Sequence, residues 1–288
     1  ALLANTTGAD NTAVGDNALA GNTTASNNTA VGYQSGYSNT TGDRIVAVGE
    51  GSLYSNTTGG YNVALGSKPL RLNTTGASNV AIGHEALYSN TTASNNTAVG
   101  FEAGYSFTTG GYSTVMGYQA AQNATAGGTV AIGHSSAKNN TGAGITAVGS
   151  NALTTNTSGT SSTGIGTAAL NDNTTGSYNV ALGRDAIYNN TTASNNVAVG
   201  YQAGYTQTTS GDSTYLGYQA GYSRTGSGNT CIGNYSGRDG TTGTDNTLVG
   251  RNSGYTITSG SKNTIIGMYN GNQHGLDIRT SSNNIVLS

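Results

Sequence analysis

The chain has 288 residues with a formal net charge of −2, and only 8% of its residues are charged. So few cations, scattered along the chain, form no basic surface for nucleic acid, and no apolar run approaches the roughly 20 residues that cross a bilayer. With 46 glycines, one proline and one cysteine, the composition also excludes a collagen repeat and a disulfide framework.

The first residues are part of a repeat that continues along the chain. Residues 1–8 read Ala-Leu-Leu-Ala-Asn-Thr-Thr-Gly, and Asn5 precedes Gly15 by the same offset at which Asn22 precedes Gly32. The sequence therefore starts in mid-repeat, in register, and it has no signal-peptide pattern there. We interpret it as a segment of a longer repetitive protein.

A phrase close to Asn-Thr-Ala-Val-Gly recurs sixteen times, and its closing glycines are 16 or 17 residues apart. Such regularity is typical of a solenoid in which each unit stacks on its neighbours. Each closing glycine is called the repeat glycine below. The repeat glycines are Gly15, Gly32, Gly49, Gly66, Gly83, Gly100, Gly117, Gly133, Gly149, Gly166, Gly183, Gly200, Gly217, Gly233, Gly250 and Gly267.

The residues before each repeat glycine predict a short strand. Thr or Val stands three residues before it, usually Ala two before, and a large apolar residue immediately before. Apolar and β-branched residues suit a pleated surface, the flanking Asn and Gly suit turns, and frequent glycine prevents helices. The sequence predicts an all-β parallel β-solenoid of about 17 coils over residues 1–272, each coil with two short strands and two turns.

Alternation along the strand places neighbouring side chains on opposite faces. We expect the Thr or Val and the large apolar residue to point into the coil, and Ala and Gly to point outward. A solvent-facing strand normally carries polar residues on its outer face, so a small and featureless face indicates that another chain covers it. The sequence thus predicts a homo-oligomer, the alternative being a single solenoid with an exposed Ala face.

The repeat decays near the end of the chain. Ser288 stands where a glycine is expected, at a spacing of 21 residues from Gly267 instead of 17. We expect residues 273–288 to form an irregular last coil or a transition to another module.

Residues suited to catalysis or metal binding do not gather in the sequence. His84 and His134 each follow a repeat glycine but lie three coils apart, about 14 Å along the axis, which is too far to share a metal. Glu85 and Glu102 occupy equivalent places on adjacent coils, and we interpret them as a chance pair on a solvated face. Cys231 replaces a strand Ala and is expected to be a small buried residue. We predict no catalytic residue, metal site or cofactor.

Tyrosine recurs five residues after many repeat glycines, and it has two interpretations. A stacked ladder would stiffen the solenoid, and its recurrence with the repeat favours this. Aromatic rings among Asn and Thr also suit sugar binding, because a ring face covers the apolar face of a pyranose. The candidate glycan contacts are Tyr37, Tyr105, Tyr205, Tyr222 and Tyr255.

Asn-x-Thr is a glycosylation acceptor pattern wherever a glycosylating machinery meets it. Here it lies within an Asn-Thr-Thr phrase that recurs with the repeat, so a structural turn is the favoured interpretation. The sites are Asn22, Asn39, Asn56, Asn73, Asn90, Asn173 and Asn190.

Two phrases resemble a known family. Ser-Asn-Val-Ala-Ile-Gly at residues 78–83 and Val-Ala-Ile-Gly at residues 130–133 resemble the head repeat of trimeric autotransporter adhesins. Asn-Val-Ala-Val-Gly-Tyr-Gln-Ala-Gly at residues 196–204 is similar to repeats of bacterial and phage tail-fibre-domain proteins. Over about residues 1–272, the resemblance implies a left-handed β-roll, three chains packed side by side and an extracellular location. The 17-residue period is longer than that of the adhesin repeat.

Three functions compete on these observations. The first is a structural fibre or adhesin segment of a bacterial surface or phage tail fibre, a rigid shaft or head that attaches to a cell-surface glycan or protein receptor. It would need no catalysis, nucleic acid or membrane insertion. The second is an ice-binding β-solenoid that uses Thr ladders, since Thr recurs eight residues after the repeat glycines. The third, a polysaccharide-processing β-helix enzyme, needs gathered carboxylates that the sequence lacks.

Overall fold

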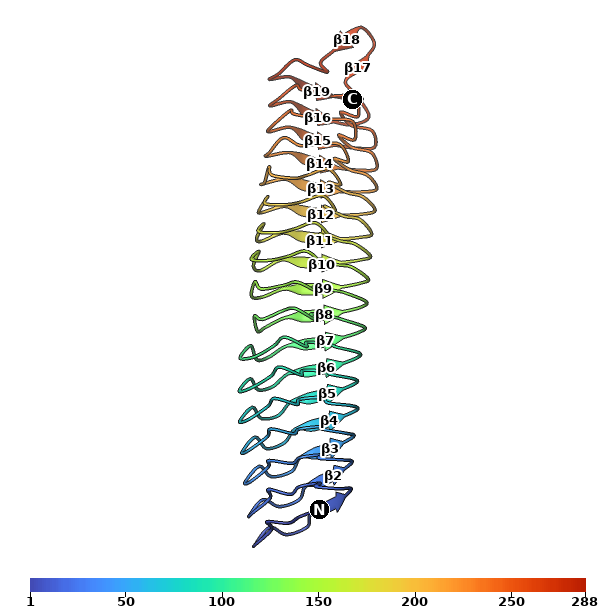
Figure 1. Ribbon diagram of the computed structural model, residues 1–288. Coiled ribbons are helices and arrows are strands. Elements are labelled where there is room, and N and C mark those ends of the chain that lie inside the picture. The colour runs from blue at the N-terminus through green and yellow to red at the C-terminus, as the bar shows by residue number, and fades with distance from the viewer. The chain divides into compact units, whose positions relative to one another are not determined.

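The computed structural model describes all 288 residues, and the chain divides into two compact units, residues 1–144 and 145–288. Both units are parallel β-solenoids without helices, together about 16 coils of about 17 residues (Figure 1). The predicted all-β solenoid is thereby confirmed. The expectation of two strands in each coil was wrong, because each coil has one three-residue strand and its remaining residues form turns.

The strands follow the repeat. Those of the first unit are β1 (Thr12–Val14), β2 (Thr29–Val31), β3 (Val46–Val48), β4 (Val63–Leu65), β5 (Val80–Ile82), β6 (Thr97–Val99), β7 (Thr114–Met116) and β8 (Val130–Ile132). Those of the second unit are β9 (Thr146–Val148), β10 (Thr163–Ile165), β11 (Val180–Leu182), β12 (Val197–Val199), β13 (Thr214–Leu216), β14 (Thr230–Ile232), β15 (Thr247–Val249), β16 (Thr264–Ile266), β17 (Asn272–Gln273), β18 (Leu276–Asp277) and β19 (Ile285–Leu287).

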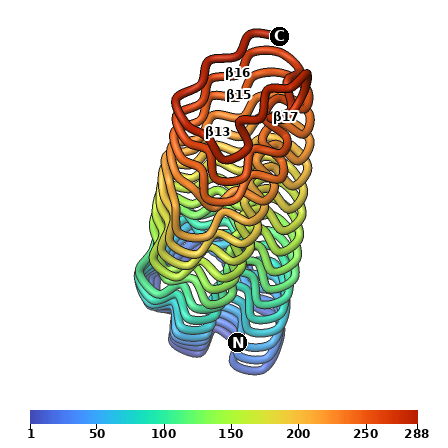
Figure 2. The backbone as a smooth tube through the Cα atoms, turned by 90° about the horizontal axis from the view of Figure 1, so that it is seen from above, coloured from blue at the N-terminus to red at the C-terminus, as the bar shows by residue number.

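Within each unit, equivalent residues of successive coils lie next to each other. Ala13 pairs with Ala30 in the parallel register of β1 and β2. The turns are bonded in the same way, since Thr40 N donates to Thr57 O over 2.9 Å. Successive coils therefore overlie one another when seen from above (Figure 2). Because backbone donors and acceptors in both strands and turns find partners on the next coil, the repeat satisfies the main chain without long strands.

The strand face that looks into the coil is the opposite of the expected one. The central residue is buried, with Ala47 0% exposed, whereas Val46 and Val48 on either side of it are half-buried. The expectation that the Thr or Val and the large apolar residue fill the coil was wrong. Other side chains already fill the interior of this coil, including Leu53 and Asn56, both 0% exposed, so its strand has room for little more than a methyl group. Some coils with Gly in place of Leu53 bury larger residues at the strand centre, such as Tyr215 and Leu248.

Leu and Gly alternate at the position four residues after the repeat glycine, and the backbone conformation there explains this choice. The backbone is left-handed in both forms, with φ of 51° at Leu53 and 60° at Gly36. A left-handed leucine costs about 1–2 kcal/mol, which burial of its side chain, worth about 1.5–3 kcal/mol, offsets. Where Gly takes the place, a larger neighbour fills the space: a Cβ on Gly104 would lie 2.7 Å from the Phe107 ring.

A column of buried asparagines, seven residues after the repeat glycines, holds the turns together. Asn73 Nδ2 donates to Asn56 Oδ1 over 2.7 Å and to Gly76 O over 2.9 Å. Each amide thus closes its own turn and bonds the preceding coil. The column ends where Phe107 takes the Asn position, and Oδ1 of the last asparagine before it, Asn90, has no partner.

The last coil of the second unit contains a hairpin. Strands β17 and β18 pair antiparallel, and Ile278 N donates to Gly271 O over 2.9 Å, which closes the base of the excursion. Strand β19 then pairs with β16 in parallel, with Ile285 beside Thr264. The longer spacing to Ser288 therefore reflects an insertion into a coil that still closes.

Candidate interaction surfaces

The outer strand face is our name for the side chains three residues and one residue before the repeat glycines. The first row holds Thr or Val, and the second row holds Val, Leu, Ile or Met. All of these side chains are half-buried or exposed. In the first unit Ile82 is 36% and Met116 42% exposed, and in the second unit Leu216 is 44% and Ile266 50% exposed.

This face is uncharged along both units. Parallel strands lie about 4.8 Å apart, so the second row forms a continuous apolar stripe within each unit. Monomeric soluble proteins rarely expose an extended apolar patch, and such patches mark sites of association. Covering the stripe would contribute about 25 cal/mol for each Å² of apolar surface removed from water.

An aromatic column flanks the outer strand face of the first unit, one residue after the repeat glycines. Ring centroids are 5.1 Å apart between His84 and Phe101, 5.2 Å between Phe101 and Tyr118, and 5.4 Å between Tyr118 and His134, all nearly parallel. The two histidines, expected to lie three coils apart on one face, are thus the ends of one stack. Aromatic residues at this position in four successive coils were the signal in the sequence.

Four of the five candidate glycan contacts lie in stacks of tyrosines. Tyr37 stacks on Tyr54 at 5.1 Å, and Tyr105 stacks on Tyr88 at the same distance. Tyr205 is stacked on both sides, by Tyr188 at 5.4 Å and Tyr222 at 5.2 Å. Because stacked rings cover each other's faces, these residues form the ladder that the repeat favoured. Glycan contact by these residues stays a prediction.

Tyr255 differs from the other four. Its nearest ring, that of Tyr235, meets it at 70° and 6.1 Å instead of stacking. Arg238 Nη1 donates to the Tyr255 hydroxyl over 2.9 Å and also pairs with Asp239 over 2.8 Å. The side chain is therefore held at its hydroxyl, while no ring is stacked on it.

The asparagines of the Asn-x-Thr patterns are inaccessible. Asn22, Asn39, Asn56, Asn73, Asn90, Asn173 and Asn190 are each 0% exposed. Their amides donate to a carbonyl three residues later, as Asn39 does to Gly42 O over 2.9 Å. The interpretation of the phrase as a structural turn is confirmed, and a glycosylating enzyme has no access to these side chains in the folded chain.

The buried core of the second unit contains ionisable groups, of which only Cys231 was expected from the sequence. Arg224 is fully buried, and its Nε donates to Gly237 O over 3.1 Å. Cys231 is buried as predicted, and burial raises the pKa of its thiol, while Arg224 opposes the shift. Burial also raises the pKa of Tyr215, whose hydroxyl donates to Gln207 over 2.9 Å. Arg224 stands seven residues after its repeat glycine, where most coils have Asn, and this substitution was the signal in the sequence for a buried arginine.

The acidic residues singled out in the sequence take different partners. Glu102 accepts a hydrogen bond from Gln119 Nε2 over 2.9 Å, and Glu85 lies 3.9 Å from His84 Nδ1. No group of three or more His, Cys, Asp or Glu side chains is placed to hold a metal ion.

A cavity of about 250 Å³ lies beside the hairpin of the second unit, lined by Asn252, Tyr255, Met268, Asn270 and Gln273. Of the candidate glycan contacts, Tyr255 is the one that lines it.

Comparison with protein-family models, curated proteins and solved structures finds no match for the chain. None of its elements is a helix of the length and apolarity needed to cross a membrane. The geometry of these surfaces and the resemblance of the repeat are therefore the guides to function.

Proposed function

We propose that the chain is a structural β-solenoid segment of an extracellular fibre or adhesin, displayed on a bacterial surface or a virion. It serves as a rigid shaft or head in attachment to a cell-surface glycan or protein receptor. The outer strand face is the main support, because its two uncharged rows are half-buried or exposed in every coil. Packing against other copies removes these rows from water.

The residues that support association differ from those expected. The Ala side chains, expected to face a neighbouring chain, lie inside the coil, and the Val, Leu, Ile and Met side chains take the outer position. This exchange strengthens the case, because larger apolar side chains contribute more on burial than Ala. The resemblance to trimeric adhesin heads supports three copies, packed side by side.

The hydrogen bonding between stacked coils suits a protein that is exposed outside the cell. Backbone bonds link coil to coil in both strands and turns, and the buried Asn column adds bonds in the same direction. Local opening then breaks several bonds together, which resists proteases that need an extended segment. The one cysteine is buried, so it is shielded from oxidants in an oxidising environment.

Light scattering on the folded chain tests the proposal directly. A mass near three times 28.7 kDa is the expected result. A monomer at micromolar concentration would contradict association through the outer strand face. A different integer multiple would keep the association and reject the trimer.

Ice binding remains the second candidate, and a specific observation favours it over the enzyme. The outer strand face of each unit carries Thr or Val beside an apolar residue at regular spacing. The Thr row expected to bind ice is less suited, because Thr40 Oγ1 donates to Thr57 O over 2.9 Å within the solenoid. Thermal hysteresis by a monomeric chain would favour this function, and a trimer without hysteresis would reject it.

A further inference from the structure

The repeat is interrupted at one place in the second unit, next to the cavity. In a regular coil, the backbone N–H of the residue four after one repeat glycine donates to the carbonyl of the residue three after the next repeat glycine. Gly36 N, for example, donates to Ser52 O over 2.9 Å. At the interruption Gly254 N donates over 2.8 Å to Tyr269 O, only two residues after Gly267. The coil is thus shortened by one residue at this point.

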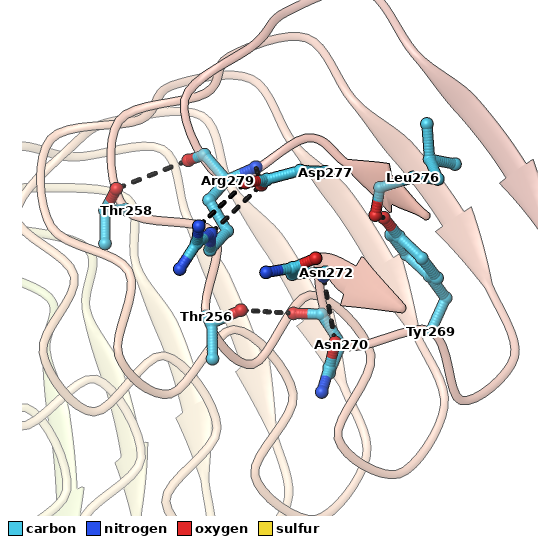
Figure 3. Close-up of polar contacts among 8 residues, drawn as sticks. All are labelled: Thr256, Thr258, Tyr269, Asn270, Asn272, Leu276, Asp277 and Arg279. Carbon is cyan, nitrogen blue, oxygen red and sulfur yellow. Dashed lines mark hydrogen bonds and ion pairs between the residues drawn. The ribbon is translucent and has the colours of Figure 1, made fainter. Parts of the chain in front are cut away.

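The interruption continues into the hairpin. Thr256 N and Oγ1 donate to Asn270 O over 2.9 and 3.0 Å, so the chain is held firmly up to Asn270 before it leaves the solenoid (Figure 3). Beyond β18, Arg279 binds Asp277, the last residue of that strand, through two bonds of 3.0 and 2.7 Å. Tyr269 OH donates to Leu276 O over 2.6 Å. The hairpin is therefore fixed at both ends, and the cavity beside it has defined walls.

Three amide side chains from separate segments line the cavity. Asn252 lies on the preceding coil, Asn270 lies just before the hairpin, and Gln273 lies on β17. The amides of Asn252 and Gln273 make no hydrogen bond within the chain, and Asn270 uses only Oδ1, which accepts from Asn272 N over 2.9 Å. Each amide therefore offers both a donor and an acceptor to a ligand.

The remaining lining residues, Tyr255 and Met268, are apolar in part. Met268 is 53% exposed, and Tyr255 is held through its hydroxyl by Arg238. No charged side chain lines the cavity. The guanidinium of Arg238 lies over the Tyr255 ring, 5.6 Å from its centroid, but it is paired with Asp239, so an ionic ligand would find no free counter-ion. A ligand with hydroxyl groups and an apolar face would satisfy the amides and contact the ring and the thioether.

We propose that this cavity binds one neutral pyranose residue of a glycan chain, and we name it the hairpin pocket. Its volume is below the roughly 300–1,000 Å³ of sites for drug-sized ligands, which suits a single sugar ring. The inference rests on the proposed attachment function and gives it a location. Asn252, Asn270 and Gln273 bond the sugar hydroxyls, and Tyr255 and Met268 contact its apolar face.

Titration of the full chain with the methyl glycosides of glucose, galactose, mannose and N-acetylglucosamine, followed by NMR, tests the pocket. We expect at least one of them to bind with a Kd on the order of 1 mM, as a ligand of this size permits. Asn252→Ala and Gln273→Ala should each weaken binding by about tenfold, because each removes a hydrogen-bonding group.

Asn151→Ala is the matched control. Asn151 occupies the same place in its coil as Asn252, with φ of 58° against 57°, and it lies outside the pocket. The two substitutions therefore carry the same backbone strain, and thermal melting checks that both variants fold. Binding should be unchanged in Asn151→Ala.

Three results would overturn the proposal: no binding of any of the four glycosides, binding that neither pocket variant weakens, or a preference for methyl glucuronide over the neutral sugars. The oligomeric state tests the proposed function, and glycoside binding tests the pocket. A trimer that binds no glycoside would retain the fibre and reject the pocket, and a monomer that binds one would do the reverse.

Discussion

The guanidinium of Arg224 occupies the space of a side chain at residue 240. A Cβ built on Gly240 would lie 2.5 Å from Arg224 Cζ. Both residues stand seven after a repeat glycine, where most coils have the buried Asn. Arg224 Nη1 lies 3.5 Å from Gly243 O, the carbonyl equivalent to Gly76 O in the Asn73 turn. One arginine thus serves two coils.

This relationship predicts strong coupling between residues 224 and 240. Gly240→Asn alone forces two side chains into one space, and Arg224→Asn alone leaves buried carbonyls without donors, so each should lower the free energy of unfolding by about 2 kcal/mol or more. The double variant places the Asn pair of a regular column at these two positions and should recover at least about 1 kcal/mol of the summed loss. Guanidinium denaturation followed by circular dichroism measures all four proteins, and additive losses would contradict the shared space.

The Asn column should contribute measurably to stability. Asn73→Ala removes the donor for the buried Asn56 Oδ1, whereas Gly76 O keeps a second donor, Asn62 Nδ2, at 2.7 Å. We expect a loss of about 1–3 kcal/mol in the free energy of unfolding, the cost of one buried unsatisfied group. Thr75→Ala, at an exposed place two residues later, should change it by no more than about 0.5 kcal/mol. Equal effects in urea denaturation would argue against the column.

The repeat glycines should tolerate no side chain because of contact as well as backbone strain. Gly83 has φ of 132°, and a Cβ there would lie 2.4 Å from Gly100 O. Gly275 also has a positive φ, of 84°, but a Cβ there would meet nothing within 4 Å. Gly275→Ala should therefore cost about 1 kcal/mol, and Gly83→Ala should cost more than about 3 kcal/mol. Thermal melting that ranks them in the opposite order would refute this account.

Charge on the outer strand face should prevent association. Val99 is half-buried in the second row, and Thr92 is exposed on another side of the coil. Val99→Lys would place a cation of every copy in the proposed interface, at a cost of several kcal/mol without partners. We expect a monomer for Val99→Lys and the wild-type mass for Thr92→Lys in light scattering. A trimer for Val99→Lys would show that the copies meet elsewhere.

The buried thiol should make the second unit less stable at alkaline pH. Burial raises the pKa of Cys231 above its usual 9.0, so above about pH 9 the unfolded chain loses this proton while the folded chain keeps it. The unfolded state then binds fewer protons, and the free energy of unfolding falls with rising pH, by up to about 1.4 kcal/mol for each pH unit. Tyr215, whose usual pKa is 10.0, adds the same effect at higher pH.

Cys231→Ala isolates the thiol's part of this effect. Denaturation midpoints between pH 8 and pH 10 should fall less steeply in the variant than in the wild type. Identical slopes would mean that the folded thiol ionises as readily as the unfolded one. A thiol reagent supplies a second check, because Cys231 should react with it only after denaturant is added.

The regular spacing of the repeat glycines was enough to predict the coil period, the strand before each repeat glycine and the turns, but the second strand expected in each coil is a turn. These features follow from local chemistry: β-branched residues favour strands, and Asn and Gly favour turns and left-handed backbone. The burial of Cys231 and the tyrosine stacks also followed from their recurrence in register. Such inferences succeed because each coil contacts mainly its two neighbours, so position in the repeat decides position in space.

Tertiary structure alone decided which face of the strand looks inward. Alternation separates Ala47 from Val46 and Val48, but it does not say which side is the interior. That depends on the space left by Leu53 and Asn56, which are buried in the same coil. The meeting of Arg224 with Gly240 and the hairpin pocket likewise depend on how side chains from different coils share a volume. By itself, therefore, the sequence determined the order of the repeat, and three-dimensional packing decided what that order buries and what it presents to a partner.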